Sequence, residues 1–207
     1  MGHAELVLEG GKGSPLTEHR RSLRLGSSLM IEPIETDRLR IRDVVLADCE
    51  AFFGYMKLEE YWRDVPIEPP TLPWVQSLVQ RCLEDQTANP RTNYFLAAAC
   101  IQSGTVIGEA ILRVESVWHG RGEVGWGVAL QYTGRGFGTE IGRAMVRLGF
   151  ELGLHRLYAQ CRVGNAASLR TMAKVGLTEE GTIRENVKAR GEWWSSCQWS
   201  ILRTDIT

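Results

Sequence analysis

The chain has 207 residues, of which 43% are hydrophobic and 24% are charged, and its formal net charge is −1. This size and composition are typical of one globular domain with a sizeable core. The balanced charge argues against a nucleic-acid partner, and no apolar run approaches the roughly 18 residues that a membrane-spanning helix needs. The N-terminus lacks a basic segment followed by an apolar one, so we expect no signal peptide and a cytoplasmic protein.

The cysteines bear on metal binding and redox state, and the first residues bear on where the domain begins. The cysteines are scattered without a CxxC motif or a Cys/His cluster, so we expect no metal site and reduced thiols. Residues 1–30 contain "EGGKGSP" and "TEHRRSLRLGSS", a composition typical of a mobile or weakly docked extension. We expect one domain over residues 31–207. The cysteines are Cys49, Cys82, Cys100, Cys161 and Cys197.

The first half of the domain is predicted to form a strand, two helices and a β-hairpin. Apolar and charged residues alternate in "RLRIRDV", the pattern of a half-buried strand. "LADCEAFFGYM" places Phe52, Phe53 and Met56 on one helical face, and a short helix and a loop follow in "KLEEYWRDVPIEPP". Thr71 is a candidate N-cap for the second helix, with Pro73 in its first turn. The runs "YFLAAACIQ" and "VIGEAILRVE", joined by "SGT", predict the hairpin.

The second half alternates strands and helices. "GEVGWGVAL" predicts a strand, and a helix over residues 138–152 follows, ended by Gly153. "RLYAQCRV" alternates as a strand, and Asn165 is a candidate cap for a short helix ended by Gly176. Two last strands within residues 178–202 join across "ARG". The order predicts an α/β (α+β) fold, in which a mixed, mostly antiparallel sheet of about six or seven strands carries about four helices.

The stretch "QYTGRGFGTEIG", residues 131–142, is the strongest local signal for a ligand. A strand that passes through a glycine-rich turn into a helix start brings backbone N–H groups and the positive end of the helix dipole to one place, which suits a phosphate or pyrophosphate. The Walker pattern fails because Thr139 and Glu140 follow Gly138, and the Rossmann pattern fails at its third glycine. Taken alone, the loop is equally compatible with a plain strand–helix turn.

Together with its neighbours, this loop resembles the GNAT superfamily of acyl-CoA N-acyltransferases, and more narrowly its RimJ/RimL-type branch. The matching segments are "ETDRLRIRDV", "VIGEAIL", the long run from "GEVGWGVALQYTGRGFG" to "NAASLRTMAKVGL", and "ARGEWWSSCQWSIL", which together span residues 34–203. The resemblance implies one GNAT domain with a splayed central strand pair. It also implies acetyl-CoA as co-substrate and a primary amine as acceptor, and it is compatible with a homodimer.

The resemblance assigns the CoA contacts to three places. The family's R/Q-x-x-G-x-G/A loop puts its glycines on Gly136 and Gly138, whereas its first slot holds Thr133, a departure that costs little because most contacts come from backbone N–H groups. Asn165 matches an asparagine that contacts the CoA arm, and it is equally suited to a helix N-cap. The implied contacts are Gly134, Arg135, Gly136, Phe137, Gly138 and Thr139 for the pyrophosphate, Trp126, Gly127 and Val128 for pantetheine and acetyl, and Asn165.

Acetyl transfer needs a base for the amine, a donor for the thioester oxygen and a proton for the thiolate. By its position before the splayed strand, Glu123 is the first candidate for the base; buried beside Trp126 it would have a raised pKa. The alternative for Glu123 is a strand-end carboxylate paired with Arg121 or Arg113. Glu109 is a weaker candidate for the base. Met172 occupies the slot where many relatives have a tyrosine acid, and Ser168 matches a serine assigned near the thiol, although it also fits a plain helix start.

The acceptor is left open between a protein N-terminal α-amine and a small-molecule amine. Among the segments that vary, acidic residues could attract a cationic amine or form a solvated face, and Tyr61 and Trp62 could form an aromatic wall or belong to the core. Trp193 and Trp194 should face opposite sides of their strand. We expect direct attack rather than a covalent acyl-enzyme, and the alternative to an enzyme is a non-catalytic acyl-CoA-binding module. The acidic residues are Glu59, Glu60 and Asp64.

Overall fold

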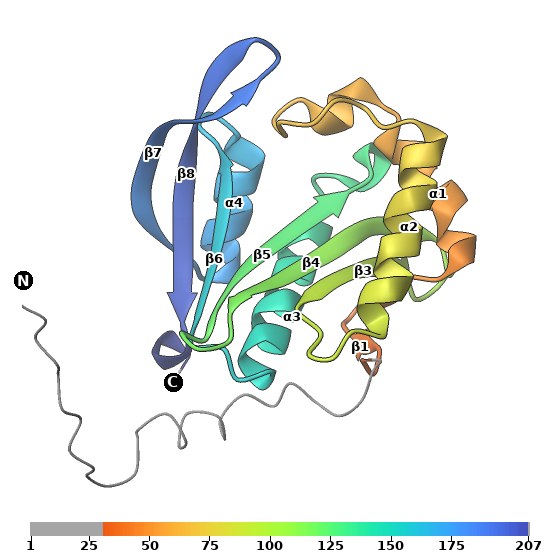
Figure 1. The fold of residues 1–207 in the computed structure, drawn as a ribbon, viewed down its shortest axis with the longest axis horizontal. Helices are drawn as coiled ribbons and strands as arrows, with labels where there is room; N and C mark the ends of the chain where they lie inside the picture. The colour runs from red at the N-terminus through yellow and green to blue at the C-terminus, as the bar shows by residue number, and fades with distance from the viewer. Residues whose placement is uncertain (1–30, 207) are drawn as a thin grey trace, which may run out of the picture.

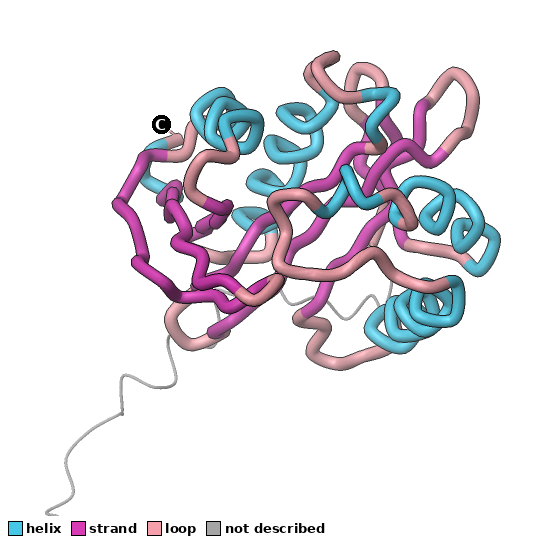
Figure 2. The backbone as a smooth tube through the Cα atoms, turned by 90° about the horizontal axis from the view of Figure 1, so that it is seen from above, coloured by secondary structure: helices cyan, strands magenta, loops and turns pink. Residues whose placement is uncertain are grey.

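The computed structural model describes residues 31–206, which form one eight-stranded sheet with helices on both faces (Figures 1 and 2). The strand order is β1-β2-β3-β4-β5-β6-β8-β7, and every neighbouring pair is antiparallel except β5–β6. The strands are β1 Ile34–Glu35, β2 Leu39–Asp43, β3 Asn93–Cys100, β4 Val106–Ser116, β5 Arg121–Val128, β6 Arg156–Arg162, β7 Thr178–Ala189 and β8 Glu192–Leu202.

Two pairs of helices cover the sheet from opposite sides. Buried side chains of α1 and α2 form one core against the sheet, and those of α3 and α4 form a second, larger core. The α-helices are α1 Cys49–Met56, α2 Leu72–Gln86, α3 Phe137–Glu151 and α4 Ala166–Val175. The 3₁₀ turns are η2 Leu46–Asp48, η3 Glu59–Trp62, η4 Leu130–Tyr132 and η5 Arg203–Asp205.

The predicted fold class is confirmed, and the differences are local. The two-residue β1 was not foreseen, because so short an edge strand has no alternation to detect. Thr71 occupies the N-cap of α2, but its side chain makes no capping hydrogen bond. Gly176 ends α4 in the left-handed conformation as expected, and Gly153 follows the end of α3 with φ of 95°. The proposed extension, residues 1–30, lies outside the described residues.

The splayed strand pair is present as a split between β5 and β6. The two strands pair in parallel at only three positions, the last being Glu123 opposite Tyr158. Beyond that position β5 continues to Val128 paired with β4 alone, and β6 continues to Arg162 paired with β8 (Figure 1). The edge of β5 that faces β6 is therefore left without a strand partner from Val124 onward. We call this divergence the split.

A buried ion pair joins β2 to the segment before β3. Arg91 and Asp43 form two hydrogen bonds of 2.6 and 3.1 Å, and their side chains are only 7% and 9% exposed. Both charges are thus removed from water, and each satisfies the other. Removing one partner leaves the other charge buried and unpaired.

We expect Arg91→Ala to lower the free energy of unfolding by about 3–5 kcal/mol, the usual cost of an orphaned buried charge. Arg40→Ala, which breaks the exposed pair between Arg40 on β2 and Glu35 on β1, should change this free energy by less than about 1 kcal/mol. Urea denaturation of both variants measures the difference. Equal losses would contradict burial as the cause.

Candidate active site

The three residues predicted to contact pantetheine and acetyl lie on β5 beyond the split. Trp126, Gly127 and Val128 pair with β4 on one side only. Strands β4 and β5 approach closely here, since a Cβ on Gly108 of β4 would lie 2.2 Å from the Gly127 carbonyl oxygen. The free edge of β5 can therefore take up an amide-bearing ligand as an added strand would.

The glycine loop has the geometry of an anion site. Gly134 and Gly136 have φ of 74° and 85°, values that residues with a side chain rarely adopt. Gly136 is the N-cap of α3, and no side chain caps the first turn, so the N–H groups there point out of the helix start uncapped. The helix begins at Phe137, one residue before the predicted start. The first turn of α3 lies against β5, because a Cβ on Gly138 would be 3.5 Å from the Trp126 ring.

Arg38, just before β2, holds this loop and was not singled out from the sequence. Its Nη1 donates a 2.9 Å hydrogen bond to the Arg135 carbonyl oxygen, and its Nε and Nη2 donate to Glu140 at 2.8 and 2.6 Å. The guanidinium also stacks 4.1 Å from the Phe137 ring centroid. The sequence offered no signal for this contact, because 102 residues separate Arg38 from Glu140.

Glu140 would by itself oppose an anion at the helix start. Burial would raise its pKa, but hydrogen bonds from Thr36 and Arg38, together with the charge of Arg38, outweigh burial and hold the pKa below its usual value. Glu140 is thus ionised, and Arg38 offsets its charge where the loop would hold a pyrophosphate.

Asn165 and Ser168 lie at the start of α4, directly after β6. The Asn165 Oδ1 accepts a 3.0 Å hydrogen bond from the Ser168 backbone N–H, so the helix-capping role is confirmed. Both side chains are half-buried. Met172, further along α4, is 2% exposed and belongs to the core. The CoA contact of Asn165 and the thiol contact of Ser168 stay predictions.

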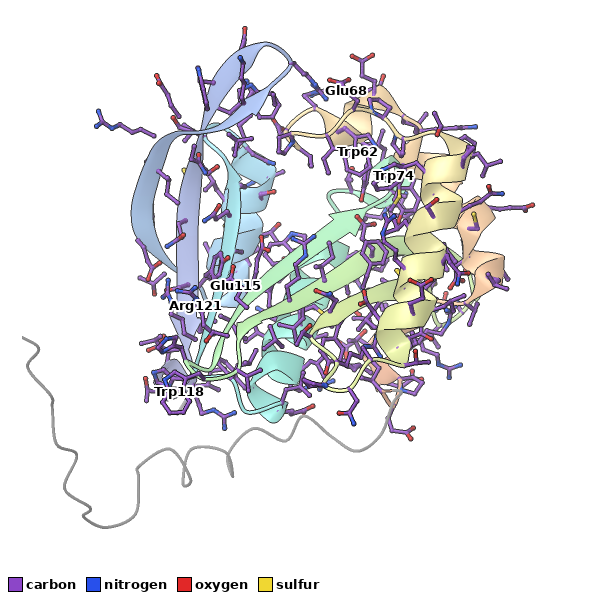
Figure 3. All side chains as sticks on the ribbon, viewed as in Figure 1. Trp62, Glu68, Trp74, Glu115, Trp118 and Arg121 are labelled. Carbon is purple, nitrogen blue, oxygen red and sulfur yellow. The ribbon has the colours of Figure 1, made fainter. Side chains whose placement is uncertain are left out.

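Glu123 stands at the point where β5 and β6 part, but not in the expected surroundings. Its carboxylate is 30% exposed and forms a 3.0 Å ion pair with Arg113. Glu123 is not buried beside Trp126, because residues three apart on a strand point to opposite faces. The alternative, a strand-end carboxylate paired with Arg113, is confirmed. Nearby, Glu115 accepts hydrogen bonds from Arg121 and from Tyr158, the residue opposite Glu123 on β6. Glu115 and Arg121 are labelled side by side in Figure 3. The catalytic role of Glu123 stays a prediction.

Glu109, the weaker candidate, has the environment that was expected of Glu123. It lies on β4 directly opposite Gly127, and it is only 6% exposed. Its two oxygens accept hydrogen bonds from Tyr55 at 2.6 Å and from Tyr61 at 2.5 Å. Burial raises the pKa of Glu109, and the two tyrosine hydrogen bonds offset this only in part.

The two sides of the split are joined at their far end by what we call the arginine bridge. Arg190, in the turn between β7 and β8, donates to the Trp62 carbonyl oxygen at 2.9 Å and lies 3.8 Å from Glu68. Arg162, at the end of β6, lies 3.6 Å from Asp64 and 3.9 Å from the Trp194 ring centroid. Trp62, Asp64 and Glu68 belong to the segment that joins α1 to α2. Trp62 and Glu68 are labelled on this segment in Figure 3. Trp194 is buried, whereas Trp193 is 59% exposed.

The described residues offer neither a metal-binding cluster nor a membrane-spanning helix. No group of three or more His, Cys, Asp or Glu side chains there is arranged to hold a metal ion. No helix in the same range is long and apolar enough to cross a membrane. A shallow groove lined by Arg143, Phe150 and Ile201 lies between α3 and the C-terminal residues, and none of the predicted site residues lines it.

The eight-stranded fold with its split is that of the GNAT acetyltransferases. The model of the acetyltransferase (GNAT) domain family matches residues 38–178, and the chain belongs to this family. The uncharacterized N-acetyltransferase YnaD of Bacillus subtilis is 33% identical over 84 residues, which are 40% of this chain and about half (49%) of that relative.

Solved structures share the whole fold. A GNAT acetyltransferase from Bacillus anthracis superposes with a TM-score of 0.73 at 26% identity, covering 83% of this chain and 98% of its own. The ribosomal-protein-S5-alanine acetyltransferase of Vibrio fischeri has a TM-score of 0.71 at 18% identity, covering 86% and 100%. The microcin C7 self-immunity acetyltransferase MccE, in complex with acetyl-CoA and AMP, has a TM-score of 0.74 at 15% sequence identity. The match covers 86% of this chain and 99% of MccE. At these last two identities the likeness shows the fold alone.

The Arg38–Glu140 contact generates a prediction for CoA binding. Arg38→Gln leaves the negative charge of Glu140 without compensation at the helix start, so the affinity for CoA should fall by about tenfold. The double variant Arg38→Gln/Glu140→Gln removes both charges and should recover most of that loss. Isothermal calorimetry with CoA measures both, with Arg40→Ala as the control. If the double variant binds as weakly as Arg38→Gln, charge compensation is not the reason.

Proposed function

We propose that this chain transfers an acetyl group from acetyl-CoA to a primary amine by direct attack. The observation that carries the proposal is the combination of the free β5 edge beyond the split with an uncapped, glycine-containing start of α3 packed beside it. One feature suits the amide groups of pantetheine, and the other suits a pyrophosphate. CoA contains both groups, joined in a single chain.

In this proposal each end of the donor has its own residues. Backbone N–H groups from Gly134 to Thr139 bind the pyrophosphate, and Arg135 adds a charge. The backbone of Trp126, Gly127 and Val128 pairs with pantetheine and the acetyl carbonyl. Asn165 reaches the CoA arm from the β6 side. The acetyl-CoA bound in MccE supports this donor on the same fold.

The chemistry requires little from the side chains of the protein. Holding amine and thioester together supplies much of the rate, and backbone N–H groups on β5 can stabilise the charge that develops on the thioester oxygen. Ser168 can donate a hydrogen bond to the leaving thiolate. Burial raises the pKa of Cys161 to about 11, so at neutral pH it is a thiol rather than a nucleophile, which supports direct attack.

The acceptor is proposed to be a protein N-terminal α-amine or a small-molecule amine. The resemblance of the sequence to the RimJ/RimL branch favours the first, and the ribosomal-protein acetyltransferase of Vibrio fischeri shows that the same fold serves such an acceptor. Glu59 and Glu60 are exposed near the split, whereas Asp64 faces Arg162. A cytoplasmic location and a homodimer remain predictions from the sequence.

The test is an amine panel. The protein is incubated with acetyl-CoA and N-terminal peptides, polyamines, aminoglycosides and amino-acid derivatives, and mass spectrometry detects acetylated products while CoA thiol release is followed. Acetylation of at least one amine above the uncatalysed rate is expected. Binding of CoA in calorimetry without turnover on any amine would favour the non-catalytic acyl-CoA-binding module instead.

The glycine loop gives a second test, of the donor alone. Gly136→Val adds a side chain at a positive φ inside the proposed pyrophosphate site, so CoA binding should be lost in calorimetry. Gly104→Val is the matched control, since Gly104 has a similar φ of 70°, open space around it and a position in the β3–β4 turn. Both variants carry about the same backbone strain, roughly 1–2 kcal/mol. Normal CoA affinity of a folded Gly136→Val protein would overturn the loop assignment.

A further inference from the structure

The carboxylate of Glu109 is buried without a cation. Its side-chain partners among residues 31–206 are two neutral hydroxyls, those of Tyr55 and Tyr61. By contrast, the buried carboxylate of Asp43 is paired with Arg91. A buried carboxylate without a positive partner costs folding free energy, and such groups gather where their ionisation is used.

The position of this group relative to β5 is fixed by a glycine. A Cβ built on Gly127 would lie 1.9 Å from the Tyr61 Oη and 2.1 Å from the Glu109 Oε1. The hydrogen bond between these two side chains therefore lies directly against the β5 backbone, at a residue beyond the split. Glu109 and Gly127 are cross-strand partners, about 5 Å apart at Cα, whereas Glu123 is four residues back along β5, about 13 Å away.

The two tyrosines differ in how they meet the site. Tyr55 comes from α1 and is 4% exposed, so its hydroxyl is enclosed in the core. Tyr61 comes from η3 and is half-buried, and its hydroxyl is the one that faces Gly127. A molecule that approaches the β5 backbone at Gly127 from this face meets the hydroxyl of Tyr61 together with Glu109.

We propose that Glu109 is the general base of the acetyl transfer and that Tyr61 passes the proton to it, an inference that rests on the proposed function. The neutral amine nitrogen attacks the thioester carbon, the C–N bond forms and the C–S bond breaks, and CoA leaves as the thiolate with the electron pair. The proton lost by nitrogen goes to the Tyr61 Oη as the hydroxyl proton of Tyr61 goes to Glu109. The thiolate takes a proton from water, and Glu109 later returns its proton to water through Tyr61.

The pH dependence follows from the groups that face Glu109. Helix α1 contributes Tyr55 and η3 contributes Tyr61. The cross-strand partners of Glu109, which are Ala97 on β3 and Gly127 on β5, have no titratable side chain. A base works only when ionised, so kcat should fall as pH drops through the raised pKa of Glu109. Tyr55 is a positioning residue, and its hydrogen bond lowers that pKa.

The experiment compares four variants over a pH series, with the amine found in the panel. Glu109→Gln should lower kcat by about 100-fold and abolish the fall of kcat at low pH, which we call the acid limb of the pH profile. Its CoA affinity in calorimetry should be unchanged. Tyr61→Phe should lower kcat on the order of tenfold. Tyr55→Phe should keep the plateau of kcat within about threefold and move the acid limb to higher pH, a shift that a merely structural role would not produce. Glu123→Gln should leave the acid limb in place.

Two results would overturn the assignment: an unchanged acid limb in Glu109→Gln, or loss of the limb in Glu123→Gln. If the wild type acetylates no amine, the proposed function fails, and Glu109 is judged separately by NMR of carboxyl-labelled glutamate, with its resonance assigned from its absence in Glu109→Gln. A raised titration midpoint that rises further in Tyr55→Phe shows that Glu109 has the environment argued here, so that the failure lies in the proposed function. A midpoint at the ordinary glutamate value overturns the base assignment.

A control on stability accompanies these measurements. Because the folded pKa of Glu109 is raised, its contribution to stability is present below the unfolded pKa and is lost as pH rises through the folded pKa. Glu109→Gln removes that loss, so near neutral pH its melting temperature should equal or exceed that of the wild type. An inactive Glu109→Gln protein that is also much less stable than the wild type would contradict the argument that the ionised carboxylate of Glu109 lowers the stability of the fold.

Discussion

The structure depends on a constraint at one strand: β5 pairs with β4 along its length but with β6 at only three positions. Backbone N–H and C=O groups need partners, and a sheet normally supplies them on both sides of a central strand. Here β6 is held away from β5 by its seven pairs with β8, and β5 is held to β4 by the close approach of Gly108 and Gly127. The released backbone groups thus stay available for a ligand inside the sheet rather than at its rim.

The elements around the split serve this one edge from different sides. Helix α3 starts against Trp126 and presents its first turn to the same end of β5, and Arg38 fixes that turn through Glu140. On the other face, α1 and η3 bring two tyrosines to Glu109. In the proposed reaction, β5 therefore separates the residues assigned to the donor from the carboxylate assigned as the base: its backbone edge and the start of α3 serve the donor, and Glu109 lies on its other face.

Much of this arrangement could be predicted from the sequence. The glycine loop, the cap at Asn165 and the order of the elements follow from local patterns. The choice between Glu123 and Glu109 as the base does not follow from local patterns, because the alternation of side chains along β4 and β5 places both glutamates on the same face of the sheet. What separates them is burial by α1 and η3, which are distant in sequence. The contact of Arg38 with Glu140 is hidden for the same reason, since an alternating strand marks Arg38 only as exposed.

The arginine bridge makes the split a closed frame rather than an open fork. Strands β5 and β6 meet at Glu123 and Tyr158, and their two sides meet again where Arg190 reaches the Trp62 carbonyl oxygen and Arg162 approaches Asp64. A force that parts β5 from β6 strains the weakest contacts between the two sides of the frame most. Those are the long, partly exposed contacts of the arginine bridge, in which Arg162 and Arg190 lie 3.6 and 3.8 Å from Asp64 and Glu68. A donor bound in the split, as proposed above, would therefore act on the segment that carries these two carboxylates.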